Sequence, residues 1–174
     1  MKKIKTKLLL DHPRVKVVED DITLPDGTPS KYLRFEYNKR AAMVIAKRLD
    51  GKIAVGKELS YPIGKRLYQF PGGGCENNES LIHAARREFL EETGYSAISM
   101  KKIGYFYIDN RRTDMKIVVF STDAVKSTIK ARGDEFDLEL YWMSPTKIGQ
   151  LITNGRVSNP TMLAGWAIYT NQVA

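Results

Sequence analysis

Residues 73–95 read Gly-Gly-Cys-Glu-Asn-Asn-Glu-Ser-Leu-Ile-His-Ala-Ala-Arg-Arg-Glu-Phe-Leu-Glu-Glu-Thr-Gly-Tyr. This stretch combines a glycine-rich entry, Pro71 to Gly74, with two arginines and several glutamates spaced along a predicted helix. Glycines let backbone carbonyls and amides approach an ion or a phosphate closely, and an ordinary solvated helix has no need of them. The stretch therefore predicts a site for a divalent metal and phosphate.

The predicted helix covers residues 80–93. Asn78 or Ser80 can cap its start, and Gly94 can adopt the left-handed conformation that ends it. Helical spacing places an apolar stripe on one face, where it can be buried, and three carboxylates on a neighbouring face. The stripe is Ile82, Ala85 and Phe89, and the carboxylates are Glu88, Glu91 and Glu92.

Carboxylates this close together repel one another and raise each other's pKa values. Bound Mg²⁺ or Mn²⁺ removes that penalty, because hard divalent cations prefer oxygen ligands. Arg87 precedes Glu91 by four residues and can hold it by a charge-assisted hydrogen bond. The alternative is a solvated glutamate-rich helix face, and the glycine entry favours the metal site.

The spacing Gly73-x5-Glu79-x7-Arg87-Glu88-x2-Glu91-Glu92-x-Gly94 resembles the Nudix box at every defining position. The resemblance implies an α/β fold, an α/β/α sandwich around a mixed β-sheet. It assigns metal ligation to Glu88, Glu92, Glu91 and the carbonyl of Gly72, with Glu91 as ligand or water activator. It places Gly73 beside the substrate and Arg87 among the catalytic residues, where Arg87 and Glu79 are expected to orient the helix.

The chain is most similar to the ADP-ribose pyrophosphatase branch of Nudix hydrolases. The similar segments are Leu24-Pro25-Asp26-Gly27, Tyr61-Pro62-Ile63-Gly64 and residues 142–166. The resemblance implies an N-terminal β-hairpin region, residues 1–38, that helps form a homodimer, followed by a hydrolase domain, residues 39–174. Two departures leave the substrate open. Ser60 stands where the branch usually has a substrate-contacting arginine, and residues 109–112 replace a Ser-Pro-Gly segment.

Two further groups are candidates from this branch. Glu135, in the acidic segment 133–136, is the expected general base in preference to Asp134, and an ordinary turn with solvated acids is the alternative. Arg111 and Arg112 can hold phosphate oxygens from a predicted hairpin tip, and plain surface arginines are the alternative.

These features predict divalent-metal-dependent hydrolysis of a nucleoside diphosphate linked to another group, such as ADP-ribose or another nucleotide sugar. The products are a nucleoside monophosphate and a phosphorylated compound. One alternative is a pyrophosphohydrolase of nucleoside triphosphates or capped RNA. Another is a non-catalytic nucleotide sensor on the same fold.

Composition indicates the number of domains, the cell compartment and the kind of binding partner. The 174 residues are 43% hydrophobic and 28% charged, typical of one globular domain, and no apolar run approaches a membrane span. The single cysteine, Cys75, excludes an internal disulfide and indicates a reducing cytoplasm. The net charge of +8 could attract nucleic acid, but Lys and Arg are scattered and form no recognised motif. A small nucleotide is therefore the expected partner.

Periodicity and turn residues predict the other elements. Strands are expected at 15–22, 31–37, 41–47, 53–56, 101–109, 115–122 and 137–143. Ser144-Pro145 and Asn159-Pro160 are expected to start two C-terminal helices.

Overall fold

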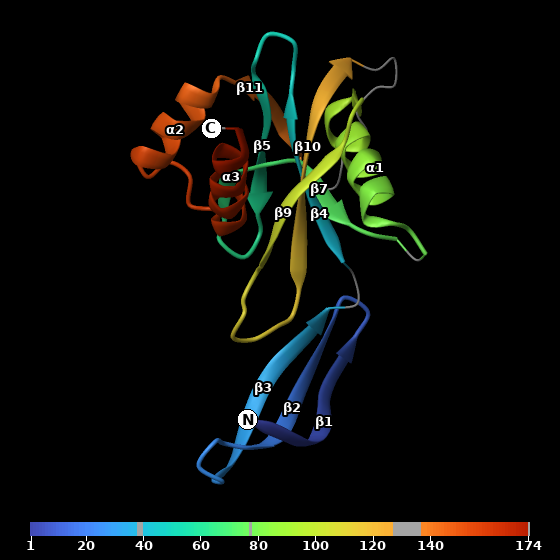
Figure 1. The fold of residues 1–174 in the computed structure, drawn as a ribbon, viewed down its shortest axis with the longest axis vertical. Coiled ribbons are helices and arrows are strands. Elements are labelled where there is room, and N and C mark those ends of the chain that lie inside the picture. Colours follow the sequence, from blue (N-terminus) through green and yellow to red (C-terminus); the bar gives the residue numbers. More distant parts are fainter. Residues whose placement is uncertain (38–39, 77, 127–136, 174) are drawn as a thin grey trace. The chain divides into compact units, whose positions relative to one another are not determined.

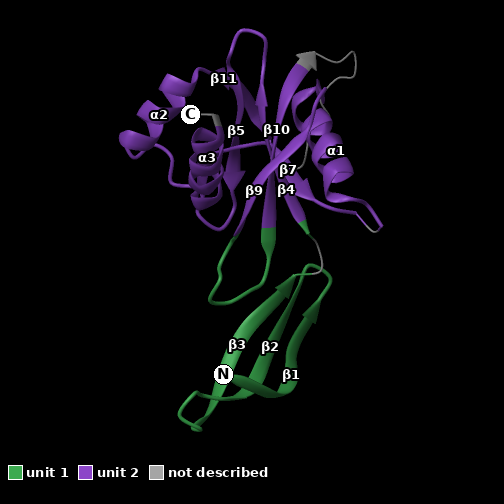
Figure 2. Cartoon of the chain, viewed as in Figure 1, with its two compact units in different colours: residues 1–40, 107–116 green, residues 41–106, 117–174 purple. Residues whose placement is uncertain are grey.

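The computed structural model describes residues 1–37, 40–76, 78–126 and 137–173. The chain divides into two compact units (Figure 2). Unit 1 comprises residues 1–40 and 107–116, and unit 2 comprises residues 41–106 and 117–174. The predicted boundary at residue 38 places segment 107–116 in the hydrolase domain. In the structure this segment groups with unit 1. No helix among the described residues is long and apolar enough to cross a membrane.

Unit 1 is built on a three-stranded antiparallel sheet in the order β1-β2-β3. The strands are β1 Lys2–His12, β2 Val15–Thr23 and β3 Pro29–Tyr37. The predicted β2–β3 hairpin is confirmed, and Gly27 takes a left-handed φ of 87° in its turn. β1, which the sequence did not predict, adds a third strand along β2.

One ion pair lies on the buried side of this sheet. Asp20 is buried, and its carboxylate accepts hydrogen bonds from Arg34 Nε at 2.6 Å and from the Thr6 hydroxyl at 2.5 Å. Arg34 also pairs with Glu36 at 2.7 Å. Each of the three strands thus contributes a side chain to one polar cluster.

Unit 2 contains an eight-stranded mixed sheet in the order β11-β5-β4-β10-β8, with β6 paired to β5, β7 to β4 and β9 to β10. β10 runs parallel to β4, and β5, β7, β8 and β11 pair antiparallel. The strands are β4 Ala41–Lys47, β5 Ile53–Ser60, β6 Lys65–Gln69, β7 Gly72–Gly74, β8 Tyr95–Ala97, β9 Lys101–Tyr107, β10 Lys116–Lys126 and β11 Glu139–Met143.

In the described part of the chain, three helices flank the sheet: α1 Leu81–Thr93, α2 Pro145–Thr153 and α3 Pro160–Val173. α1 covers one face, and α2 and α3 lie on the other (Figure 1). The predicted α/β/α sandwich is confirmed. Ser144 caps α2 by accepting a hydrogen bond from Lys147 N–H, and the Asn159 side chain accepts one from Thr161 N–H at the start of α3.

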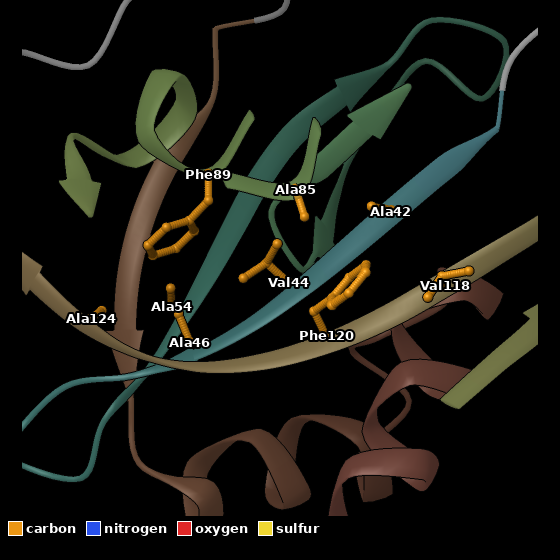
Figure 3. Close-up of a cluster of buried hydrophobic side chains, with 9 residues drawn as sticks. All are labelled: Ala42, Val44, Ala46, Ala54, Ala85, Phe89, Val118, Phe120 and Ala124. Carbon is orange, nitrogen blue, oxygen red and sulfur yellow. The ribbon is translucent and has the colours of Figure 1, made fainter. Parts of the chain in front are cut away.

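Alternation along β4 supplies the core on both faces. Toward α1, β4 packs with β10, Ala54 of β5 and two α1 side chains, Ala85 and Phe89 (Figure 3). Toward α3, Met43 lies so close to Gly165 that an added Cβ would sit 2.4 Å from its sulfur. α1 is therefore fixed to the sheet by its own buried stripe, and its opposite side remains available for the glutamates.

Candidate active site

The glycine segment is a strand and lies against α1. β7 pairs with Ala41–Met43 of β4, which brings the backbones so close that a Cβ on Gly72 would lie 2.2 Å from the Ala42 carbonyl oxygen. A Cβ on Gly73 would lie 2.6 Å from the carboxyl carbon of Glu88. Gly72 requires glycine, because a side chain would collide with the β4 backbone, whereas a side chain at Gly73 would displace the Glu88 carboxylate.

α1 begins and ends where local signals place it. The Ser80 hydroxyl accepts a hydrogen bond from His83 N–H at 3.3 Å, and Gly94 ends the helix with φ 70°. Ser80, not Asn78, is the cap, because Asn78 itself adopts a left-handed φ of 62°. Of the predicted stripe, Ala85 and Phe89 are fully buried, and Ile82 is partly buried against the same core.

Arg87 is the centre of the carboxylate cluster. Its Nε and Nη2 donate to the two oxygens of Glu79 at 3.1 and 2.9 Å, a bidentate pairing. Nη1 donates to Glu88 at 3.0 Å and to Glu91 at 3.3 Å, and Nη2 also reaches the Gly74 carbonyl at 3.1 Å. The predicted Arg87–Glu91 contact is present, but one guanidinium joins three carboxylates to β7.

Burial and charge divide these groups. Arg87 and the Glu76 backbone N–H lower the pKa of Glu79 to about 2, while the carboxylates raise the pKa of Arg87. Burial raises the pKa of Glu88 above its ordinary value, because loss of water outweighs the hydrogen bond from Arg87. Glu79 is thus a fixed anion, and Glu88 is an anion that gains from a further cation.

Glu92 connects the end of α1 to the glycine strand. Its Oε2 accepts a hydrogen bond from the Gly72 N–H at 2.9 Å. Glu92 therefore lies beside the backbone of the residue whose carbonyl is the expected fourth ligand.

The site fits a hard divalent cation by the chemistry of its donors. Glu88, Glu91 and Glu92 offer only carboxylate oxygens, and Glu88 is partly desolvated. Within the described ranges, no three His, Cys, Asp or Glu side chains are already grouped to hold a metal. The reason is visible in their partners, since Glu88 and Glu91 face Arg87 and Glu92 faces Gly72.

The predicted phosphate-binding arginines belong to unit 1, whereas the glutamates belong to unit 2. Arg112 Nη1 donates to the Leu33 carbonyl at 3.1 Å, and its guanidinium lies 5.9 Å from the centre of the Tyr32 ring. The Arg111 carbonyl accepts a hydrogen bond from the Tyr32 hydroxyl. The contact of Arg111 and Arg112 with substrate stays a prediction. Glu135 lies outside the described residues.

Several contacts of Gly74 and of side chains near the end of α1 were not predicted from the sequence. The Gly74 carbonyl holds Arg87, and Trp142 of β11 packs against Tyr95 just after α1, with ring centres 4.7 Å apart. The Arg48 guanidinium lies 4.7 Å from the Trp142 ring centre. These three side chains come from distant parts of the chain, so only the sheet order brings them together.

Comparison with known proteins agrees with this geometry. The NUDIX domain family matches residues 37–164. ADP-ribose pyrophosphatase of Bacillus subtilis strain 168 is 34% identical over 101 residues, which is 58% of this chain and 54% of that protein. The chain thus aligns with about half the length of that relative.

Other relatives carry different activities. Methanol dehydrogenase activator of Bacillus methanolicus is 30% identical over 138 residues, 78% of this chain and 74% of that protein. RNA pyrophosphohydrolase of Bartonella bacilliformis is 35% identical over 71 residues, 38% and 41% of the two chains. A crystal structure of an ADP compounds hydrolase shares the fold with a TM-score of 0.87 and 15% identity, over 99% of this chain and 95% of that one.

Proposed function

The chain belongs to the NUDIX family, and we propose that it hydrolyses the pyrophosphate bond of a nucleoside diphosphate linked to another group. The observation that carries the proposal is the Arg87 cluster, in which one guanidinium positions Glu79, Glu88 and Glu91 against a strand of glycines. Similarity to an ADP-ribose pyrophosphatase supports the class of substrate.

Members of this family generally use divalent metals, and Mg²⁺ or Mn²⁺ suits the oxygen donors of this site. The residues that would hold the metal are Glu88, Glu91, Glu92 and the carbonyl of Gly72. When bound, such a cation neutralises pyrophosphate oxygens and lowers the pKa of water. Arg87 keeps Glu88 and Glu91 in place, and the missing side chain at Gly73 leaves room for the Glu88 carboxylate.

In the reaction, a water oxygen forms a bond to one phosphorus of the anhydride, and the bond from that phosphorus to the bridging oxygen breaks. The bridging oxygen leaves with the other phosphate, so both products are phosphate monoesters. Glu91 or Glu135 accepts the proton that water loses. Arg111, Arg112 and the Gly73 backbone are the proposed contacts to phosphate.

A second candidate activity is hydrolysis of nucleoside triphosphates or of RNA 5′ ends. The net charge of +8 and the similarity to an RNA pyrophosphohydrolase favour it. Pyrophosphate release from a triphosphate, with strong inhibition by salt, would assign this activity in place of the first.

Product analysis separates these candidates. The full chain is incubated with Mg²⁺ or Mn²⁺ and a panel of ADP-ribose, other nucleotide sugars, dinucleoside polyphosphates, nucleoside triphosphates and capped RNA. The proposal expects a nucleoside monophosphate from one diphosphate compound. Tight nucleotide binding without turnover in either metal would contradict it and indicate a sensor.

We also propose that unit 1, as the N-terminal region, joins two copies of the chain. β1 exposes Ile4, Leu8, Leu9 and Leu10, whose exposed fractions lie between 47% and 66%. Sedimentation of the wild type is expected to give a dimer, and the double substitution Leu8→Lys/Leu10→Lys is expected to give a monomer. A wild-type monomer at micromolar concentration would contradict the proposal.

The single cysteine, which is buried, is consistent with a cytoplasmic location.

A further inference from the structure

A cavity of about 300 Å³ opens in unit 2 away from the glutamates. Its walls come from the end of β4, the middle of β10, the segment before β9 with the first residue of β9, and α3. They are formed by Lys47, Ser99, Lys101, Ser121, Thr122, Asp123 and Tyr169. None of these residues belongs to the cluster around Arg87.

The cavity lies on the opposite face of the sheet from α1. Ala42, Val44 and Ala46 pack in the core under α1, so the side chain of Lys47 points to the face that carries α3 and Tyr169. The glycine strand pairs at the other end of β4, at Ala41–Met43. The strand rise puts Ala42 and Lys47 about 16 Å apart along β4. The cavity is therefore separate from the candidate active site.

The walls carry two lysines, Lys47 and Lys101, and one carboxylate, Asp123. Lys47 and Lys101 form no ion pair with any residue in the described part of the chain, although Asp123 is the register partner of Lys47 on the parallel strand β10. The two lysines outnumber the single carboxylate, so the net charge of the cavity walls is positive and favours an anionic ligand.

Hydroxyl groups complete the donor set. Ser99 and Ser121 line the cavity beside the lysines, and Tyr169 is only 8% exposed. Burial, together with the negative charge of Asp123, raises the pKa of Tyr169, so its hydroxyl keeps its proton and can donate. Donors thus outnumber the one carboxylate, which can accept a hydrogen bond from a ligand hydroxyl.

We propose that this cavity binds a small phosphate monoester that carries hydroxyl groups, with its phosphate on Lys47 and Lys101 and a hydroxyl on Asp123. Ligand sites span about 300–1,000 Å³, so a cavity at the lower limit accommodates a single sugar phosphate and excludes a dinucleotide. The site is a binding site beside the proposed hydrolysis, and its test does not depend on catalysis.

The test is calorimetric titration of the full chain with ribose 5-phosphate, in a chelator so that no metal recruits phosphate to the glutamates. Lys47→Gln and Lys101→Gln are each expected to weaken binding about tenfold, the scale of one lost charge-assisted contact. Lys102→Gln is the matched control, because Lys102 is an exposed neighbour that contacts the Tyr105 ring instead of the cavity. In NMR spectra, ribose 5-phosphate is expected to shift the backbone amide signals of residues 99, 101 and 121–123.

Two comparisons make the proposal falsifiable. Asp123→Asn is expected to weaken ribose 5-phosphate binding and to leave inorganic phosphate binding unchanged or tighter. No binding of ribose 5-phosphate, equal weakening by Lys102→Gln, or shifts confined to residues 72–74 would overturn the site. Equal affinity for inorganic phosphate and ribose 5-phosphate, unaffected by Asp123→Asn, would overturn the assigned ligand class.

Discussion

β4 of unit 2 and β1 of unit 1 each contain a run of consecutive aliphatic residues, yet they are buried to opposite extents. Every residue of β4 except Lys47 is buried, and every residue of β1 is exposed. β4 lies inside its sheet with helices on both faces, whereas β1 is an edge strand paired with β2. The place of a strand in its sheet, and not its aliphatic content, determines whether it forms core.

The largest expected effect concerns the site that β4 supports. Glu92→Gln is expected to lower kcat at least about 100-fold on the best substrate of the panel, the scale on which loss of one catalytic charge acts. The measurement is steady-state kinetics at saturating Mg²⁺, with circular dichroism as the check on folding. Glu76→Gln is the control, since Glu76 contributes its backbone N–H to Glu79. Wild-type turnover in Glu92→Gln would remove Glu92 from the mechanism.

A matched pair of isoleucines tests the burial difference itself. Ile45 on β4 is fully buried and Ile4 on β1 is 66% exposed. Ile45→Ala is expected to lower the free energy of unfolding by about 2–5 kcal/mol, because it leaves a cavity. Ile4→Ala is expected to change it by about 0.5 kcal/mol or less in the monomer. Urea unfolding at low protein concentration measures both.

The same pair sharpens the comparison if β1 is covered by a second copy of the chain. A destabilisation by Ile4→Ala that grows with protein concentration would show that a dimer interface buries β1. Equal destabilisation at all concentrations would contradict the exposed assignment of this strand.

Acid is expected to weaken unit 1 through Asp20. Arg34 and Thr6 hold the pKa of Asp20 below its ordinary value of 3.8, so the folded state favours the anion. The resulting stability is present at neutral pH and is lost as pH falls through the lowered folded pKa. Asp20→Asn is expected to cost about 1–3 kcal/mol at pH 7 and to reduce the acid-induced loss. Hydrogen exchange of β2 amides between pH 7 and pH 2 checks this. Identical pH profiles in the variant and the wild type would show that Asp20 does not set the acid response.

The smallest expected effect is at the start of α1. Ser80→Ala removes the hydroxyl that accepts from His83 N–H and is expected to cost about 1 kcal/mol. Thermal unfolding measures the loss, and Asn78→Ala serves as the comparison for the alternative cap. A larger loss from Asn78→Ala would assign the main constraint on the helix start to the left-handed residue 78.

The helix ends could be predicted because their signals lie in neighbouring residues. Ser80, Gly94 and Ser144 act within one helical turn, so the bounds of α1 and the start of α2 follow from neighbouring residues. β1 was missed because Leu8-Leu9-Leu10 does not alternate, and the structure places a register shift there. β7 was missed because three glycines have little strand propensity.

The sheet order and the contacts within the site could not be predicted, because they join residues that are far apart in the sequence. The parallel pairing of β10 with β4 joins residues more than seventy positions apart, and no local pattern encodes it. The hold of Arg87 on Glu79 and Gly74 depends on the loop before α1 turning back along the helix. The metal-ligating residues could be proposed from spacing, whereas the contacts that position them required the fold.

The Arg87 guanidinium gives the site a permanent internal counter-ion, and this separates folding from metal loading. Three carboxylates that would otherwise repel one another already have a cation in contact with them, so α1 does not need a metal in order to form. We expect a chelator to abolish turnover while leaving the melting temperature nearly unchanged. The metal-free chain would then stay folded and bind metal reversibly. The concentrations of the available cations would determine which metal occupies the site.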